Sequence, residues 1–238
     1  MGEDKIFQAW INPLAFLDVD EPWAGVGQNQ PNLDAVVGFL CPPGMPADVD
    51  SLVARYKEIS TEPVRLFAAP AEPRILEKLV WPLRHAKGAY VVGNYLAVIA
   101  LSGMVTEMLA ILAWELGEAT LGGHAMTDAE EKALFGTTFE RLGQDRRVQV
   151  LAAYGMIDPT ARGRFDTVRE IRRKYLHVWS QDHDTLAKDA RAGFHAAVAL
   201  VTTIIGQDIK DGKMLLNPQL VKYLERQGLC GPADGDAV

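Results

Sequence analysis

The sequence predicts an all-α protein built as an up-and-down helical bundle. Apolar residues recur at helical spacing along several long segments, and no segment alternates polar and apolar residues at the period of a strand. No internal repeat is visible at periods of about 20 to 50 residues, which argues against a solenoid or propeller. Hydrophobic residues make up 48% and charged residues 23%, as in ordinary globular chains, so a packed core is expected.

The predicted organisation has three parts. Residues 1–71 are rich in proline and glycine, which interrupt regular elements, and only residues 47–59 are expected to form a short helix. Residues 72–209 carry the bundle. Residues 210–238 are expected to add a C-terminal helix and a polar tail.

The helices of the bundle are expected in chain order. Their predicted spans are 72–84, kinked or ended by Pro82; 89–116; 127–156, opened by a capping box at Thr127 and broken near Gly143; 163–179, after a turn at Asp158 and Pro159; and 185–209.

The compartment is inferred from cysteine usage and from the N-terminus. Cys41 and Cys230 show neither metal-binding nor redox spacing and are interpreted as free thiols in a reducing environment. The first ten residues include Glu3 and Asp4 and lack the long apolar core of a secretory signal. A cytoplasmic protein is therefore expected.

The segment 89–116 is apolar almost all round, so it suits either the central helix of a soluble bundle or a membrane span. A charged residue at the centre of a span costs about 2.5 to 3.5 kcal/mol on insertion scales, and Glu107 lies inside this segment. The neighbouring helices are amphipathic and no basic flank follows. We therefore predict a central helix and no contact with a membrane.

The residue spacings of this chain do not match the familiar catalytic motifs. The chain has no HExxH motif, no cysteine-based zinc pattern and no GxSxG motif, and residues 206–213 do not match a phosphate-binding loop. His177, Asp182 and His183 are the nearest approach to a metal-binding group, and they are interpreted as a polar helix end and loop. No metal and no cofactor are expected.

The charge distribution is uneven. The net charge of −7 argues against non-specific coating of nucleic acid. Residues 141–174 nevertheless hold nine basic and four acidic residues, a local charge of +5 that leaves −12 for the rest of the chain. Such asymmetry suits an anion or an RNA backbone bound at one place, and a solvated charged face is the alternative.

The segment 164–179 holds the candidate site. On a helix its apolar residues form one stripe, made of Phe165, Val168, Tyr175, Leu176 and Trp179. Arg172 falls inside this stripe and needs a partner, because an unpaired buried charge is costly. The partner is an acidic residue, with Glu107 the obvious candidate, or a phosphate-sized ligand, or a wet interface. Arg169, Arg173 and His177 follow at four-residue steps along one side of the same helix.

The stretch from Ile171 to His177, IRRKYLH, resembles the Arg-x4-His motif of the HEPN (higher eukaryotes and prokaryotes nucleotide-binding) superfamily. Residues 147–158, followed by the motif helix, resemble the order found in HEPN-like mannitol-operon repressors. The resemblance covers roughly residues 72–209. Arg173 departs from the family pattern, since this position usually holds Asn, Asp or His.

The resemblance implies a helical bundle that dimerises by bringing two motifs together, and in many members a metal-independent ribonuclease. Arg172 and His177 would then be catalytic, with Glu107, Arg169 and Arg173 in supporting or binding roles. RNA and an antitoxin or regulatory protein are the implied partners. Two alternatives stay open: a non-enzymatic regulatory or protein-interaction module, and a purely structural ion pair between Arg172 and Glu107.

Overall fold

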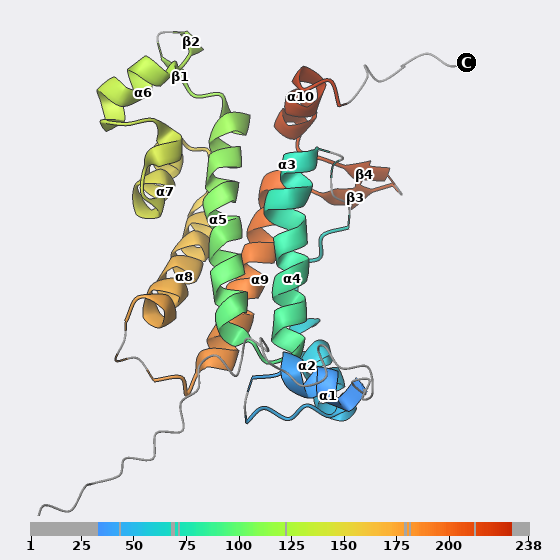
Figure 1. The fold of residues 1–238 in the computed structure, drawn as a ribbon. Coiled ribbons are helices and arrows are strands. Elements are labelled where there is room, and N and C mark those ends of the chain that lie inside the picture. The colour runs from blue at the N-terminus through green and yellow to red at the C-terminus, as the bar shows by residue number, and fades with distance from the viewer. Residues whose placement is uncertain are drawn as a thin grey trace, which may run out of the picture.

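The computed structural model describes residues 33–42, 44–67, 70, 72–121, 123–178, 180, 182–211 and 213–229. The body of the bundle is formed by α4 (Trp81–Val91), α5 (Tyr95–Gly117), α8 (Pro159–Leu176) and α9 (Leu186–Ile205). α5 lies at the centre and packs against the other three, and α8 also packs against α9 (Figure 1). The all-α bundle predicted from the sequence is confirmed.

α5 is the helix for which the sequence allowed either a membrane span or a central place in the bundle, and the central place was predicted. Its length and composition alone would let this helix cross a membrane. However, 56% of its most apolar 18-residue stretch is buried inside the protein. α4, α7 (Gln144–Ala153), α8 and α9 all pack against it. Burial on several sides by other helices is the environment of a central helix in a soluble bundle.

The chain breaks between α4 and α5, where the sequence predicted one helix over 89–116. Gly93 adopts a φ of 84°, and the Asn94 side chain accepts a hydrogen bond from the backbone N–H of Ala97 at 3.2 Å. A left-handed glycine ends a helix, and an asparagine cap begins the next one. The predicted start of the apolar helix was therefore wrong, since α5 begins at Tyr95.

Pro82 does not end its helix. α3 (Pro73–Ile75), the π-helical turn η2 (Leu76–Val80) and α4 follow one another without a gap. The backbone N–H of Trp81 bonds to the carbonyl of Leu76, five residues back. The π turn shifts the hydrogen-bond register just before Pro82, which lies in the first turn of α4 and has no N–H to donate. Of the two expectations for Pro82, a kink or an end of the helix, the end was wrong for this reason, and α4 continues to Val91.

The region between α5 and α8 is more divided than the sequence suggested. It contains α6 (Asp128–Phe135), the 3₁₀ turn η3 (Phe139–Arg141) and α7. The predicted break near Gly143 is confirmed, and a further break occurs at Gly136, where φ is 79°. The predicted turn at Asp158 and Pro159 was wrong. Asp158 accepts a hydrogen bond from the N–H of Ala161 at 2.6 Å and caps α8, and Pro159 is its first residue.

The predicted capping box at Thr127 is confirmed and gives a pH-dependent contribution to stability. The backbone N–H and hydroxyl of Thr127 donate to Glu130 at 2.9 and 2.8 Å, and His124 contacts it at 2.8 Å. These hydrogen bonds lower the pKa of Glu130 to about 2. The folded pKa is below the unfolded value of about 4.3, so this stabilisation is complete above that value and disappears as the pH falls towards 2.

NMR titration of the Glu130 side chain is expected to give this low pKa in the wild type. In Thr127→Ala the pKa should rise part of the way towards the ordinary value, because the hydroxyl donor is lost while the backbone N–H of residue 127 still donates to Glu130. An unchanged titration in the variant would contradict the capping assignment.

Segments outside the predicted bundle join the same core. α2 (Val49–Ile59) confirms the short helix predicted in the N-terminal extension, and its buried Ile59 belongs to the main core. Arg55 of α2 donates to the carbonyl oxygens of Val91 at 2.6 Å and of Pro46 at 2.9 Å, which ties α2 to the end of α4. At the other end of the chain, α10 (Pro218–Arg226) packs against α5, as the predicted C-terminal helix.

Some elements were not expected. They are α1 (Leu33–Leu40) and two antiparallel hairpins, which pair β1 (Thr120–Leu121) with β2 (His124–Ala125) and β3 (Asp208–Lys210) with β4 (Lys213–Leu215). α1 occupies a stretch without proline between Pro31 and Pro42, long enough for two helical turns. Cys41 is a buried free thiol, whereas Cys230 and residues 1–32 lie outside the described residues.

Candidate functional site

The candidate site begins with the apolar stripe of α8. Phe165, Val168 and Tyr175 are buried, as predicted, and Arg172 lies within the same stripe. Leu176 is exposed, so its predicted place in the buried stripe was wrong, and Trp179 lies outside the described residues. The guanidinium of Arg172 donates from Nη1 to Oε1 of Glu107 on α5. The predicted pairing of these two residues is confirmed. Their side chains are 36% and 28% exposed, so the ion pair lies at an opening of the bundle, within reach of solvent.

Gly103 makes this pairing possible. A Cβ atom on Gly103 would lie 2.6 Å from Cδ of Arg172, so the stem of the arginine crosses α5 directly over the glycine. Gly103 is one helical turn before Glu107, which places the guanidinium beside the carboxylate. A glycine inside a helix costs about 1 kcal/mol relative to alanine, and the close approach of Arg172 explains its presence. Sequence reasoning missed this residue.

A small pocket of about 110 Å³ collects the predicted site residues. α5 and α8 form most of its wall, and α7 contributes one side chain. The residues that line it are Gly103, Thr106, Glu107, Gln144, Val168, Arg169, Arg172, Arg173 and His177. All five site residues predicted from the sequence therefore lie around one pocket. Gln144 was not predicted, and its Nε2 donates to the carbonyl oxygen of Thr106 at 3.2 Å.

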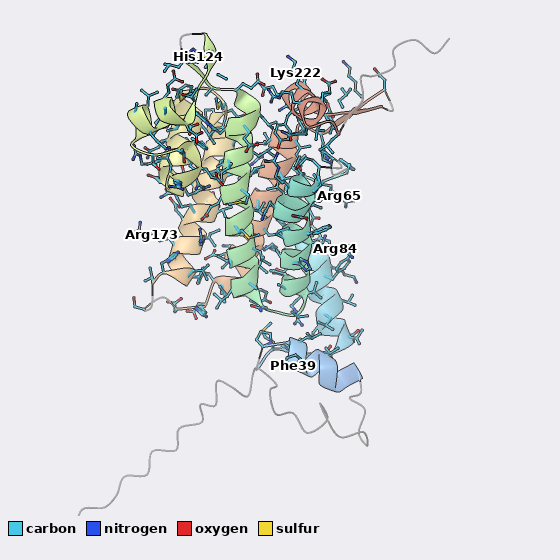
Figure 2. All side chains as sticks on the ribbon, turned by 45° about the horizontal axis from the view of Figure 1, so that its top comes forward. Phe39, Arg65, Arg84, His124, Arg173 and Lys222 are labelled. Atoms are coloured by element: carbon cyan, nitrogen blue, oxygen red, sulfur yellow. The ribbon has the colours of Figure 1, made fainter. Side chains whose placement is uncertain are left out.

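The cations of the pocket differ in their partners. Arg169 pairs with Asp145 at 3.4 Å and with Asp166 at 3.2 Å. Arg173 is exposed and makes no ion pair or hydrogen bond with any residue that the structure describes. Figure 2 shows it beside the lower part of α8, on the side away from α4. Arg173 is thus the arginine at the pocket that stays available to an outside anion.

His177 is the residue that follows the last turn of α8. Its side chain is exposed and has no hydrogen-bond partner among the described residues. An exposed imidazole beside a pocket can take or give a proton without first breaking an internal contact. This is the placement expected of a general acid or base.

A polar cluster fixes the end of α8 from which His177 projects. The carboxylate of Asp189 on α9 accepts hydrogen bonds from Lys174 at 2.9 Å, Tyr175 at 2.7 Å and Thr185 at 3.0 Å. Burial alone raises the pKa of Asp189, but these hydrogen bonds outweigh it and the net shift is downward. The ionised carboxylate therefore joins the last turn of α8 to the first turn of α9.

The basic excess over residues 141–174 is partly neutralised in the folded chain. Arg172 pairs with Glu107 and Lys174 with Asp189, and both carboxylates belong to other segments. These two cations of the segment are therefore already paired with carboxylates. At the pocket the available positive charge is concentrated at Arg173.

The other histidines do not extend the site. Within the part of the chain that the structure describes, no three metal-binding side chains lie together. His183 packs edge-on against Tyr175 with ring centroids 5.8 Å apart, and His124 lies on the β1–β2 hairpin, beside Glu130 (Figure 2).

The fold and the site together define an all-α bundle protein with an arginine- and histidine-lined pocket between three helices. Comparisons of the chain with protein-family models, with curated proteins and with solved structures found no match. The function is therefore argued from the pocket itself.

The role of Gly103 gives a prediction that a double-mutant cycle can check. In the wild type, Gly103→Ala should lower the free energy of unfolding, because the new methyl group displaces Arg172 from Glu107. In an Arg172→Ala background the same change should raise it by about 1 kcal/mol, the gain in helix propensity. Urea denaturation measures both values.

Gly88 provides the matched control. It lies exposed in α4, and a Cβ added there would meet no atom within 4 Å. Gly88→Ala should therefore raise the free energy of unfolding in both backgrounds. If Gly103→Ala behaves in the same way in both backgrounds, the close packing of Arg172 over Gly103 has no energetic role.

Proposed function

We propose that this protein is a HEPN-like RNA-binding protein that cleaves RNA without a metal ion. The observation that carries the proposal is the convergence of Arg172, Arg173 and His177 on one small pocket. The pocket has no Phe, Tyr or Trp side chain in its wall, and its volume of about 110 Å³ is well below the roughly 300 Å³ at which ligand pockets usually begin. These features favour a phosphate group of the backbone over a nucleobase.

The chemistry that this set of side chains supports is attack of an RNA 2′-hydroxyl on the neighbouring phosphate. His177 acts as a general acid or base, which contributes about 10² to 10⁴ in rate in enzymes generally. Arg172 stabilises the negative charge that develops on the phosphate, and Arg173 adds attraction for the backbone. The proposal includes a dimer in which two such pockets come together, in a toxin, defence or stress-response setting in the cytoplasm.

The proposal predicts that RNA is cut and DNA is not. A labelled single-stranded RNA and a DNA of the same sequence are incubated with the protein in excess EDTA. Cleavage of the RNA alone is expected, because the nucleophile is the 2′-hydroxyl and no metal takes part. Cleavage that disappears on adding EDTA, or that affects both strands equally, would reject the proposed reaction.

A non-enzymatic regulatory module is the second candidate. Arg172 and Arg169 are already engaged with carboxylates, and Arg173 stands where the HEPN pattern usually has Asn, Asp or His. Such a module binds a regulatory protein, an antitoxin or a nucleotide at the same pocket and catalyses no reaction. It is supported if the RNA binds in a salt-dependent way and stays intact in the experiment above.

A further inference from the structure

The proposed reaction needs two proton transfers at one phosphate. A proton leaves the attacking 2′-oxygen, and another must reach the 5′-oxygen of the leaving nucleotide. One imidazole either takes a proton or gives one in a single step, so His177 cannot do both at once. A second titratable group at the same phosphate would carry the other proton, and the chain itself offers one.

Among the residues that line the pocket, Glu107 is the only carboxylate. Asp145 and Asp166, the other carboxylates nearby, are paired with Arg169 and are not part of the lining. Thr106 and Gln144 do line the pocket, but neither a hydroxyl nor an amide titrates near neutral pH. The choice of a second proton-transfer group therefore falls on Glu107.

The two oxygens of Glu107 differ in their contacts. Oε1 accepts the hydrogen bond from Arg172, whereas Oε2 has no hydrogen-bond partner in the part of the chain that the structure describes. Arg172 thus fixes the orientation of the carboxylate and leaves one oxygen as a free acceptor. Its guanidinium carries five N–H donors, so it can hold Glu107 and still contact a phosphate.

We infer that Glu107 is the general base of the reaction and that His177 is the general acid. This inference rests on the proposed ribonuclease function. Oε2 of Glu107 takes the proton from the 2′-hydroxyl, and the 2′-oxygen forms a bond to phosphorus. The bond from phosphorus to the 5′-oxygen breaks, and the protonated His177 gives its proton to that oxygen. The products are a 2′,3′-cyclic phosphate and a free 5′-hydroxyl.

The small size of the pocket supports a direct role for both groups. A pocket of about 110 Å³ leaves room for one phosphodiester group and little else. Glu107 from α5 and His177 from the end of α8 both line it. Each of the two proton transfers then has its own group, Glu107 on α5 and His177 at the end of α8, within one chain.

An activated substrate separates the two roles. Uridine 3′-(4-nitrophenyl phosphate) also reacts through its 2′-hydroxyl, but its nitrophenolate leaves without a proton from an acid. In EDTA, Glu107→Gln should slow cleavage of both RNA and this substrate by about 10²-fold or more. His177→Ala should slow cleavage of RNA to a similar extent and leave the nitrophenyl substrate nearly unaffected.

The variants are chosen to preserve the fold. Gln keeps an oxygen that accepts from Arg172, and equal thermal unfolding of Glu107→Gln and wild type verifies this. Glu107→Asp retains a carboxylate and should recover part of the activity that Gln loses. If Glu107 served only to accept the hydrogen bond from Arg172, Glu107→Gln would instead retain the activity.

The possible outcomes distinguish failure of the proposed ribonuclease function from failure of the roles assigned to Glu107 and His177. Wild-type protein that cleaves neither substrate rejects the ribonuclease and this inference together. Cleavage that survives in Glu107→Gln rejects the role of Glu107 alone. Equal losses on both substrates in His177→Ala would make His177 the base, for example through a second copy of the chain, and would also reject it.

Discussion

Replacing His177 with alanine is expected to lower RNA cleavage by about 10² to 10⁴, the usual contribution of a general acid or base. The fold should survive, because the side chain is exposed and has no hydrogen-bond partner among the described residues. Exposed substitutions of this kind usually change the free energy of unfolding by no more than about 0.5 kcal/mol. Cleavage of a labelled single-stranded RNA in EDTA, at verified folding, measures the effect.

His183→Ala is the matched control. His183 is also exposed and lies in the same connection between α8 and α9, but it is not part of the pocket lining. Its loss should leave cleavage close to the wild-type rate. If the two alanine variants lose activity equally, the rate depends on the connection as a whole and His177 has no special role.

The largest effect on stability is expected from Trp114→Ala. The indole stacks on Phe139 with ring centroids 4.4 Å apart and meets Phe135 and Tyr154 edge-on. Its Nε1 donates to Glu131 at 2.8 Å, and the same carboxylate accepts from the N–H of Phe139 at 2.7 Å. Truncation leaves a cavity and removes one partner of a buried carboxylate. The expected loss in the free energy of unfolding is about 3 to 5 kcal/mol.

Trp81 offers a control of the same residue type. Its side chain is in α4 and is among the exposed large apolar residues. Trp81→Ala should cost less than about 1 kcal/mol, since little contact area is lost. Chemical denaturation of both variants gives the comparison. A cost for Trp81→Ala that equals or exceeds the cost for Trp114→Ala would show that the aromatic cluster is not a main support of the fold.

The fold could be predicted where the sequence pattern is long and local. α8 and α9 follow from apolar periodicity, and α6 follows from its capping box. The errors lie where a boundary depends on finer backbone chemistry. Gly93 and Asn94 separate two helices inside an apolar run, and a π turn carries the chain past Pro82. The periodicity of apolar residues reveals neither the break nor the π turn, because the apolar spacing continues on both sides of each.

The site could be predicted where an isolated charge demands a partner. Arg172 interrupts an apolar stripe and Glu107 interrupts an apolar helix, so pairing them required no knowledge of the fold. Gly103, Gln144 and Asp189 could not be assigned, because their roles depend on how α5, α7 and α9 approach α8. Gly103 did leave a signal, a glycine one turn before one of the two glutamates of an otherwise apolar helix.

We propose that the pocket cuts RNA through the 2′-hydroxyl of the substrate. The most direct test is a labelled DNA strand that contains one ribonucleotide, incubated with the wild-type protein in excess EDTA. The account predicts one cut, immediately 3′ of the ribonucleotide, and a 2′,3′-cyclic phosphate on the upstream product. A strand that stays intact while all-RNA is cut, or a cut at a deoxynucleotide, would contradict the account.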